Sequence, residues 1–332
     1  MKLRNLLLAL VLISTLAAGC AGAPQKQVYR IGVLLSGDIR LEPFAGLKDG
    51  LKELGYVEGE DVVFEVRNAG GDRAKLPELA QEIVSSRPDV AVAGGGVEAD
   101  ALKAATEGSD LPVVFLAVAS AVDRGLVASM TSSGNNLTGI DTNDTALTAK
   151  RLEFITKMVP QARRILILHV PSITPSVESV RVAEETALGL GLELTIVPVE
   201  TEEDTRKAAA SISADDVDAI LLVPGTVPVR GAMKEILWPV SVAQKIPIMG
   251  IEREELGRGA VAIYGPSRYA TGVQAARLVD KVLRGTRPAD IPIETPEKLE
   301  FVINLTIADR LGLEIPDEAW GLADEVVEIE VK

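Results

Sequence analysis

Short apolar runs alternate with longer segments of helical spacing throughout the chain. Residues 113–116 form one such run, in which four apolar side chains follow Pro112 without an intervening polar residue. Unbroken runs of this length are typical of parallel strands that are covered on both faces. Residues 73–86 instead place apolar side chains three and four positions apart, which is the spacing of one helix face. Regular alternation of the two patterns predicts an α/β fold with helices on both faces of a parallel sheet.

The same alternation runs through the chain twice. Three segments of the first half recur in order in the second half, namely 30–34 as 164–168, 88–92 as 217–221, and 111–113 as 246–248. Their offsets are 134, 129 and 135 residues. A pattern that repeats at a near-constant offset indicates an internal repeat. Because 332 residues are too many for one ordinary core, we predict two α/β lobes.

The N-terminus has the pattern of a secretory signal, predicted to span residues 1–19. Lys2 and Arg4 form a basic start, and the apolar run 6–18 is shorter than the ~17–25 residues that span a bilayer. The small residues before Cys20 resemble a bacterial lipobox, which implies cleavage before Cys20 and a lipid on this residue. Residues 20–27 would then be a lipidated tether to the membrane. The alternative is an ordinary signal peptide with a chance cysteine.

Composition and charge exclude several classes of function. The chain is 47% apolar and 25% charged, as in globular proteins. Its net charge of −14 disfavours nucleic acid as a partner. It lacks a Gly-x-Ser-x-Gly elbow, a phosphate loop and a His/Cys cluster for a metal, so we expect no enzyme, cofactor or metal site. The one histidine, His169, ends a predicted strand and is either a packed residue or a contact in a cleft.

Three consecutive glycines, Gly94 to Gly96, end the third predicted strand. With the following residues they fit the dinucleotide pattern Gly-x-Gly-x-x-Ala, but that motif belongs on the first strand of a sheet. No acidic residue ends the next strand to hold a ribose. A start of a helix at Val97 could instead bind a carboxylate through free N–H groups and the helix dipole. The alternative is a glycine turn without a ligand.

Four stretches together resemble one protein family. They are LPVVFLAVASAVDRGLVAS, GNNLTGI, RLEFITKMVPQARRILIL, and the long segment from RGAVAIYGPS to ADRLGLEIP. The chain resembles the extracytoplasmic substrate-binding lipoproteins of ABC transporters, in the group that includes tryptophan-binding lipoproteins. Where members commonly have Ser-Asp-Pro-Val, this chain has Ala119-Ser120-Ala121-Val122, so a role of that aspartate cannot be transferred.

The resemblance implies a type I periplasmic-binding-protein fold. Two doubly wound parallel-sheet lobes would be joined by a three-strand hinge, with a ligand in the cleft between them. Lobe 1 would comprise residues 28–138 and 265–287, and lobe 2 would comprise residues 139–264 and 288–332. The helix expected at 267–284 has no counterpart in the first repeat and would return to pack on lobe 1.

Ligands of open α/β sheets lie beyond the carboxyl ends of the strands. This rule selects twelve candidate ligand-binding residues, namely Ser36, Asp38, Gly95, Gly96, Val97, Ala119, Ser120, His169, Ser172, Gly225, Thr226 and Glu252. Ser36, Ser120 or Thr226 could donate to a carboxylate. Asp38 or Glu252 could accept from an amino group. Each residue alone could instead be a solvated loop position.

We therefore predict a non-catalytic, monomeric, extracytoplasmic receptor anchored through Cys20. It would bind a small solute, such as an amino acid or similar carboxylate, and present it to an ABC permease. The alternatives are a lipid-anchored sensor with a signalling partner, and an enzyme. An aromatic content of only 3% weakens the case for an aromatic amino acid stacked in the cleft.

Overall fold

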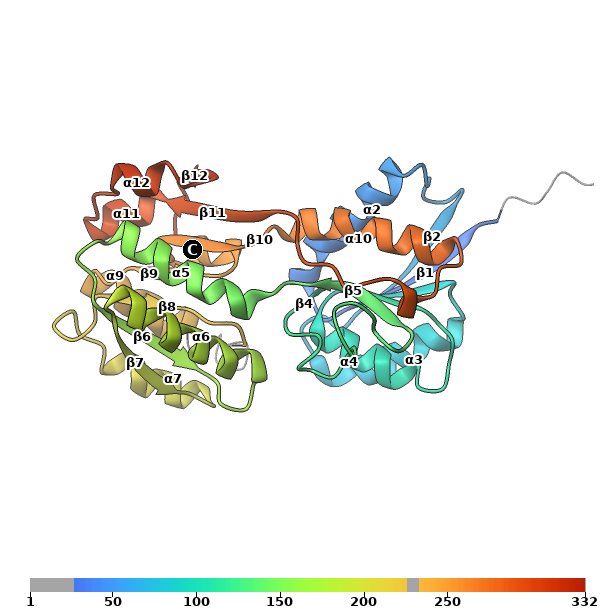
Figure 1. Cartoon of the computed structure of the whole chain (residues 1–332), viewed down its shortest axis with the longest axis horizontal. Coiled ribbons are helices and arrows are strands. Elements are labelled where there is room, and N and C mark those ends of the chain that lie inside the picture. Colours follow the sequence, from blue (N-terminus) through green and yellow to red (C-terminus); the bar gives the residue numbers. More distant parts are fainter. Residues whose placement is uncertain (1–26, 226–232, 332) are drawn as a thin grey trace, which may run out of the picture.

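The computed structural model describes residues 27–225 and 233–331. They form two α/β lobes that lie side by side, with the chain passing repeatedly between them (Figure 1). Each lobe has one sheet with helices on both faces, as the alternating pattern predicts. The expected fold class is therefore confirmed.

The first lobe has a five-stranded, all-parallel sheet of order β2-β1-β3-β4-β5. Its elements are β1 (Tyr29–Leu35), η1 (Asp38–Arg40), α2 (Leu41–Glu53), β2 (Val62–Asn68), η2 (Arg73–Lys75), α3 (Leu76–Ser86), β3 (Val90–Ala93), α4 (Gly96–Ala105), β4 (Val113–Val118), β5 (Leu137–Asp141), α10 (Arg268–Leu283) and η6 (Pro288–Asp290). Helices α2 and α10 share one core with the sheet, whereas α3 and α4 share the core on its other face.

The second lobe has a seven-stranded sheet of order β12-β11-β10-β9-β8-β6-β7, in which only β10 and β11 pair antiparallel. Its elements are α5 (Asp144–Met158), β6 (Arg164–His169), α6 (Thr174–Leu190), β7 (Glu193–Pro198), α7 (Glu202–Ala210), β8 (Ala219–Leu221), the π-helical η4 (Met233–Leu237), α9 (Trp238–Gln244), β9 (Ile248–Gly250), η5 (Arg253–Arg258), β10 (Ala262–Pro266), β11 (Leu299–Asn304), α11 (Leu305–Leu311), α12 (Asp317–Trp320) and β12 (Glu325–Val327). Residues 319–327 contribute to α12 and to β12, which pairs with β11.

The two lobes repeat the same strand order and the same polar contact. Strands β2-β1-β3-β4 of the first sheet correspond to β7-β6-β8-β9 of the second. The carboxylate of Asp89 accepts from the backbone N–H of Arg30 at 2.6 Å, and that of Asp218 accepts from the N–H of Arg164 at 2.8 Å. The Arg164 guanidinium also bonds Asp218 and lowers the pKa of its carboxyl to about 2. These contacts join equivalent strands of the repeat found in the sequence.

The three crossings lie later in the chain than the sequence predicts. Strand β5 pairs with β4 through Asp141, so the chain leaves the first sheet after this residue and not at 138. The second crossing follows Pro266, the last residue of β10. Residues 288–298 remain on the first lobe, where Ile291 and Ile293 are buried, and the third crossing therefore falls just before β11. The pattern of apolar runs locates strands, but it does not show which sheet an edge segment joins.

Helix α10 returns to the first lobe and lies directly on α2 (Figure 1). Glycines allow this approach: a Cβ at Gly272 would overlap the carbonyl oxygen of Pro43, and a Cβ at Gly46 would overlap that of Tyr269. A backbone carbonyl in a packed helix cannot move aside as a flexible side chain can. The seam between α2 and α10 therefore fixes where the second crossing enters the first lobe.

We predict that Gly272→Ala destabilises the protein by about 1–3 kcal/mol or more, because the added methyl overpacks this seam. Gly189→Ala is the matched control, since position 189 also lies in a helix and has no atom within 4 Å of the added carbon. There the better helix propensity of alanine should raise stability by up to about 1 kcal/mol. Denaturant unfolding measures both changes, and equal stability of the Gly272 variant and the parent would contradict this packing.

Candidate functional site

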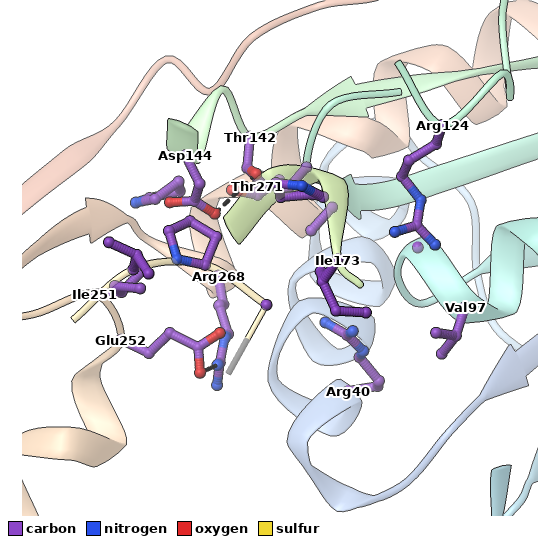
Figure 2. Close-up of a pocket in the computed structure, with 18 of the residues that line it drawn as sticks. Arg40, Val97, Arg124, Thr142, Asp144, Ile173, Ile251, Glu252, Arg268 and Thr271 are labelled. Carbon is purple, nitrogen blue, oxygen red and sulfur yellow. Dashed lines mark hydrogen bonds and ion pairs between the residues drawn. The ribbon is translucent and has the colours of Figure 1, made fainter. Parts of the chain in front are cut away.

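A cavity of about 220 Å³ lies between the two lobes at the carboxyl ends of their strands (Figure 2). The first lobe contributes loops that follow β1, β2, β3 and β4, and the second contributes loops that follow β6, β8 and β9. The first two crossings complete the wall through Thr142, Asp144, Pro266 and Arg268. Both lobes and the connections between them therefore contact the same small space.

The twelve predicted residues divide into four groups in the structure. Five line the cavity, namely Gly96, Val97, Ala119, Gly225 and Glu252. Ser36 and Asp38 line an adjoining hollow that shares Arg40, Arg73 and Glu252 with the cavity. The cavity lining does not include Gly95, Ser120, His169 or Ser172. Thr226 lies outside the described residues.

The residues beside the cavity have other roles. Ser172 donates through its hydroxyl to Glu200 at 2.7 Å, within the second lobe. The ring of His169 is partly buried, and its Nδ1 has no hydrogen-bond partner in the part of the chain that the structure describes. Ser120 adopts a positive φ of 57°, and its backbone N–H donates to the buried Asp141. Ser120 therefore shapes the loop after β4 through its backbone.

Two arginines enclose the glycine turn at the start of α4. A Cβ at Gly95 would overlap the guanidinium of Arg40, and a Cβ at Gly96 would lie 3.2 Å from that of Arg124. Figure 2 shows Arg40 and Arg124 directed toward the same space, with Val97 between their elements. The first N–H groups of a helix have no partner within the helix. This wall therefore presents cations and backbone donors together.

Acidic partners, one buried and one exposed, hold these guanidinium groups in place. Glu98 is fully buried and accepts from the N–H of Ser36 at 2.8 Å and from Nε of Arg40 at 3.1 Å. Arg124 pairs with Asp100 through one terminal nitrogen, while its buried Nε has no hydrogen-bond partner among the described residues. Arg124 also lines the cavity, where its guanidinium borders Gly96.

The opposite wall carries acidic and aliphatic groups. Glu252 ion-pairs with Arg268, which also pairs with Glu254. Burial acts to lower the pKa of the Arg268 guanidinium, but the carboxylates of Glu252 and Glu254 outweigh it and raise the pKa, so the cation persists. Ile173 and Ile251 add apolar surface beside these charges. In Figure 2 Asp144 and Glu252 lie on the side of the cavity opposite Arg124.

Residues 29–327 match the family model described as "ABC transporter substrate binding protein". The match covers most of the chain, including both lobes and all three crossings. The chain belongs to this family of substrate-binding proteins. It is 29% identical over 259 residues to the tyrosine-binding protein of Clostridioides difficile, covering 78% of this chain and 73% of that relative.

Two solved structures resemble this substrate-binding protein over most of its length. The ABC domain of Streptococcus pneumoniae in complex with L-Trp is 25% identical, with a TM-score of 0.79. A conserved domain protein of Vibrio cholerae is 27% identical, with a TM-score of 0.78. Each likeness covers 91% of this chain and 100% of the other. The two lobes and their crossings are therefore shared across these proteins.

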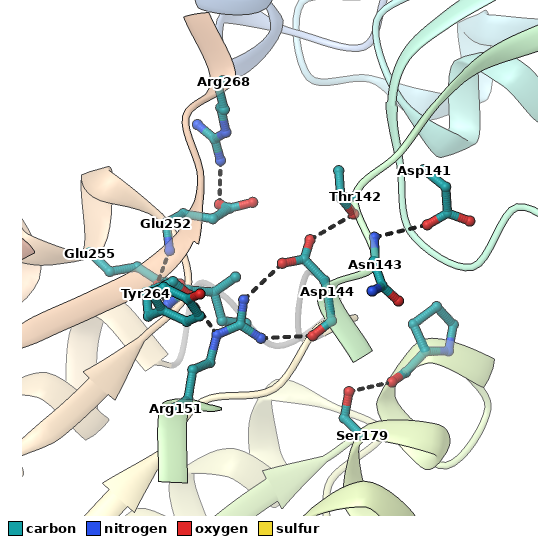
Figure 3. A network of polar contacts seen from close by, with 12 residues as sticks. Asp141, Thr142, Asn143, Asp144, Arg151, Ser179, Glu252, Glu255, Tyr264 and Arg268 are labelled. Carbon is teal, nitrogen blue, oxygen red and sulfur yellow. Dashed lines mark hydrogen bonds and ion pairs between the residues drawn. The ribbon is translucent and has the colours of Figure 1, made fainter. Parts of the chain in front are cut away.

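A buried guanidinium holds two crossings of the substrate-binding protein together (Figure 3). Arg151 of α5 is fully buried and donates to the carboxylate of Asp144 at 2.8 Å, to its carbonyl oxygen at 2.9 Å and to the carbonyl oxygen of Tyr264 at 2.7 Å. Thr142 donates to the same carboxylate at 2.9 Å. Asp144 is thus fixed at the edge of the cavity by contacts behind it.

Asp141 ties the first crossing to the loop after β4. Its carboxylate accepts from the backbone N–H groups of Ser120, Ala121 and Asn143 at 3.3, 2.7 and 2.9 Å. Burial raises the pKa of the Asp141 carboxyl, and these three N–H groups oppose the rise. The bonds set the backbone beside Ala119, which lines the cavity. Asp141 is therefore a positioning residue.

The arginines of the site were not predicted from the sequence. Arg40 belongs to the turn before α2, Arg124 lies several residues beyond β4, and Arg268 begins α10 after a crossing. Arg40 and Arg124 lie only a few residues beyond the carboxyl ends of β1 and β4, so a search that included these further loop positions would find both. Arg268 requires knowledge of where the chain crosses.

Within residues 27–225 and 233–331, no three His, Cys, Asp or Glu side chains come together in a way that could hold a metal ion. No helix there has both the length and the apolar character needed to cross a bilayer.

We predict that Arg151→Met lowers stability by about 3–5 kcal/mol, because it leaves Asp144 charged and partly buried without its partner. Combining it with Asp144→Asn should cost less than the sum of the single changes, with a coupling of about 1–3 kcal/mol by denaturant unfolding. The exposed pair of Arg181 and Glu185 on α6 is the control, and its coupling should stay below about 0.5 kcal/mol. Additive effects at Arg151 and Asp144 would show that the two side chains do not act as a pair.

Proposed function

We propose that this protein is the extracytoplasmic solute-binding component of an ABC importer and that its solute is an amino acid. The observation that carries the proposal is the cavity between the lobes, with guanidinium groups and a helix start on one wall and carboxylates on the other. A zwitterion has the complementary charges. The tyrosine-binding relative and the L-Trp complex support an amino acid as the class of ligand.

The carboxylate of the solute would lie at the start of α4. Gly96 and Val97 line the cavity there and present N–H groups at the positive end of the helix dipole. Arg124 lines the cavity and adds a charged group beside Gly96. Charge-assisted hydrogen bonds of this kind are about twice as strong as neutral ones. This end of the cavity would therefore provide much of the binding free energy.

The amino group would lie near Asp144 and Glu252. Both carboxylates line the cavity, and both are already held, by Arg151 and by Arg268 respectively. A carboxylate has up to four acceptor sites, so each can accept a further bond from an ammonium group. Because the two residues belong to a crossing and to the second lobe, such a ligand would connect both lobes.

Binding would favour closure of the lobes by bending at the three crossings. A closed, ligand-bound form is what a permease could distinguish from the empty receptor. The rival role is a lipid-anchored sensor that reports the same closure to a signalling partner. Neighbouring permease and ATPase genes together with solute uptake would favour the importer.

We predict that Arg124→Gln weakens amino-acid binding at least tenfold, because it removes a charged hydrogen bond worth about 1.5–3 kcal/mol. Isothermal titration calorimetry with the amino acid that binds the parent most tightly measures the effect. Arg181→Gln, on the exposed surface of α6, is the matched control and should bind as the parent does. Unchanged affinity of a folded Arg124 variant would remove this arginine from the site.

Anchoring through Cys20 is a separate proposal, since this residue lies outside the described part of the chain. The lipobox pattern before Cys20 supports it, and the thiol is the only one in the sequence. We predict that the parent incorporates labelled fatty acid in a bacterial host and that Cys20→Ala does not. Continued labelling of the variant would contradict lipid attachment at this position.

A further inference from the structure

None of the aromatic side chains of the protein lines the cavity between the lobes. The chain has five Phe, four Tyr and two Trp, and all of them lie within residues 27–225 and 233–331. The cavity lining among these residues includes none of them. Stacked or edge-to-face rings stabilise each other by about 0.5–1.5 kcal/mol beyond burial. An aromatic solute would find no such partner here.

The rings are engaged elsewhere and cannot easily turn toward the solute. Tyr269 directly follows the cavity residue Arg268, but its hydroxyl donates to Asp49 at 2.7 Å. Tyr264 lies two positions before the cavity residue Pro266, and its ring meets Phe154 edge to face at 4.9 Å between centroids. Phe154 in turn stacks on the buried Phe301 at 4.1 Å. Trp238 is buried beneath the other face of the second sheet. Packing therefore keeps the rings of Tyr264, Phe154, Phe301 and Trp238 in the cores.

Aliphatic side chains occupy the positions where a solute side chain would lie. Val97 comes from the first lobe, while Ile173, Val223 and Ile251 come from the second. Figure 2 shows Ile173 directed into the space between Arg40 and Val97. Ile173 is backed by Gly225, where an added Cβ would lie 2.5 Å from its methyl group. A wall of branched side chains gains free energy by burying other aliphatic groups, at roughly 25 cal/mol per Å².

The size of the cavity favours a small solute. Pockets for drug-sized ligands measure about 300–1,000 Å³, whereas this cavity measures about 220 Å³. Val223 is fully buried and Ile251 nearly so, and Arg40 is held by Glu98, so each of these side chains is held within its own lobe.

We propose that this substrate-binding protein selects an aliphatic amino acid over tryptophan and tyrosine. The inference rests on the proposed function and adds the class of side chain to it. The ionic ends of the solute would be bound as described above, and Val97, Ile173 and Ile251 would determine which side chain is accepted. Specificity would then differ from that stated for the tyrosine-binding relative and for the L-Trp complex.

Calorimetry on the purified protein with L-leucine, L-isoleucine, L-valine, L-tryptophan and L-tyrosine tests the inference. We expect at least one aliphatic amino acid to bind at least tenfold more tightly than either aromatic one. Equal or tighter binding of tryptophan or tyrosine would overturn the inference and leave the proposed function standing. If none of the five binds to protein that melts cooperatively, the inference is overturned, whereas the proposed function is contradicted only if none of the other amino acids binds either.

A pair of variants tests whether the aliphatic side chains of the cavity determine the specificity. Ile173→Ala should reduce the ratio of aliphatic to tryptophan affinity at least fivefold, because it removes aliphatic surface and enlarges the cavity. Val177→Ala, one turn along the same segment and exposed, should leave that ratio unchanged. A role in folding alone would lower the melting temperature without changing the ratio. An unchanged affinity ratio in a folded Ile173 variant would overturn the claim that this side chain helps to select an aliphatic solute.

Discussion

The buried guanidinium of Arg151 is the contact on which the arrangement of the two lobes depends. It belongs to the second lobe, yet its bonds to Asp144 and Tyr264 hold the first two crossings side by side. Since Asp144 borders the cavity, the same contact that joins the crossings also fixes one wall of the site. A lysine could not replace it, because one ammonium lacks the planar fork that reaches several acceptors at once.

The first lobe is completed by a segment that is distant in sequence. Helix α10 covers the sheet together with α2, and residues 288–298 bring Ile291 and Ile293 into its cores before the chain returns. The first lobe is therefore not a continuous stretch of chain. Motion between the lobes must be taken up by short segments at the crossings, because the elements on either side are packed into separate cores. Such an arrangement allows hinge bending while both cores stay intact.

Much of this fold follows from local patterns. Unbroken apolar runs predict the buried strands, and helical spacing predicts the helices. Asp89 and Asp218 occupy equivalent positions of the repeat, and each accepts from a backbone N–H of the neighbouring strand. The crossings were placed too early because apolar spacing does not distinguish β5 from a connecting strand. Among the site residues, the strand-end rule located the loops at Gly96, Ala119, Gly225 and Glu252. It could not find Arg268, whose place at the cavity depends on where the chain changes lobe, nor show that His169 lies outside the lining.

The central claim is that one solute contacts both lobes and draws them together. Small-angle X-ray scattering of the purified protein tests it directly, with and without a saturating concentration of the amino acid that calorimetry shows to bind. The account predicts a smaller radius of gyration and a shorter maximum dimension in the bound state. Identical scattering curves with calorimetrically saturated protein would contradict it, because a ligand that leaves the lobes apart cannot be held by both walls of the cavity.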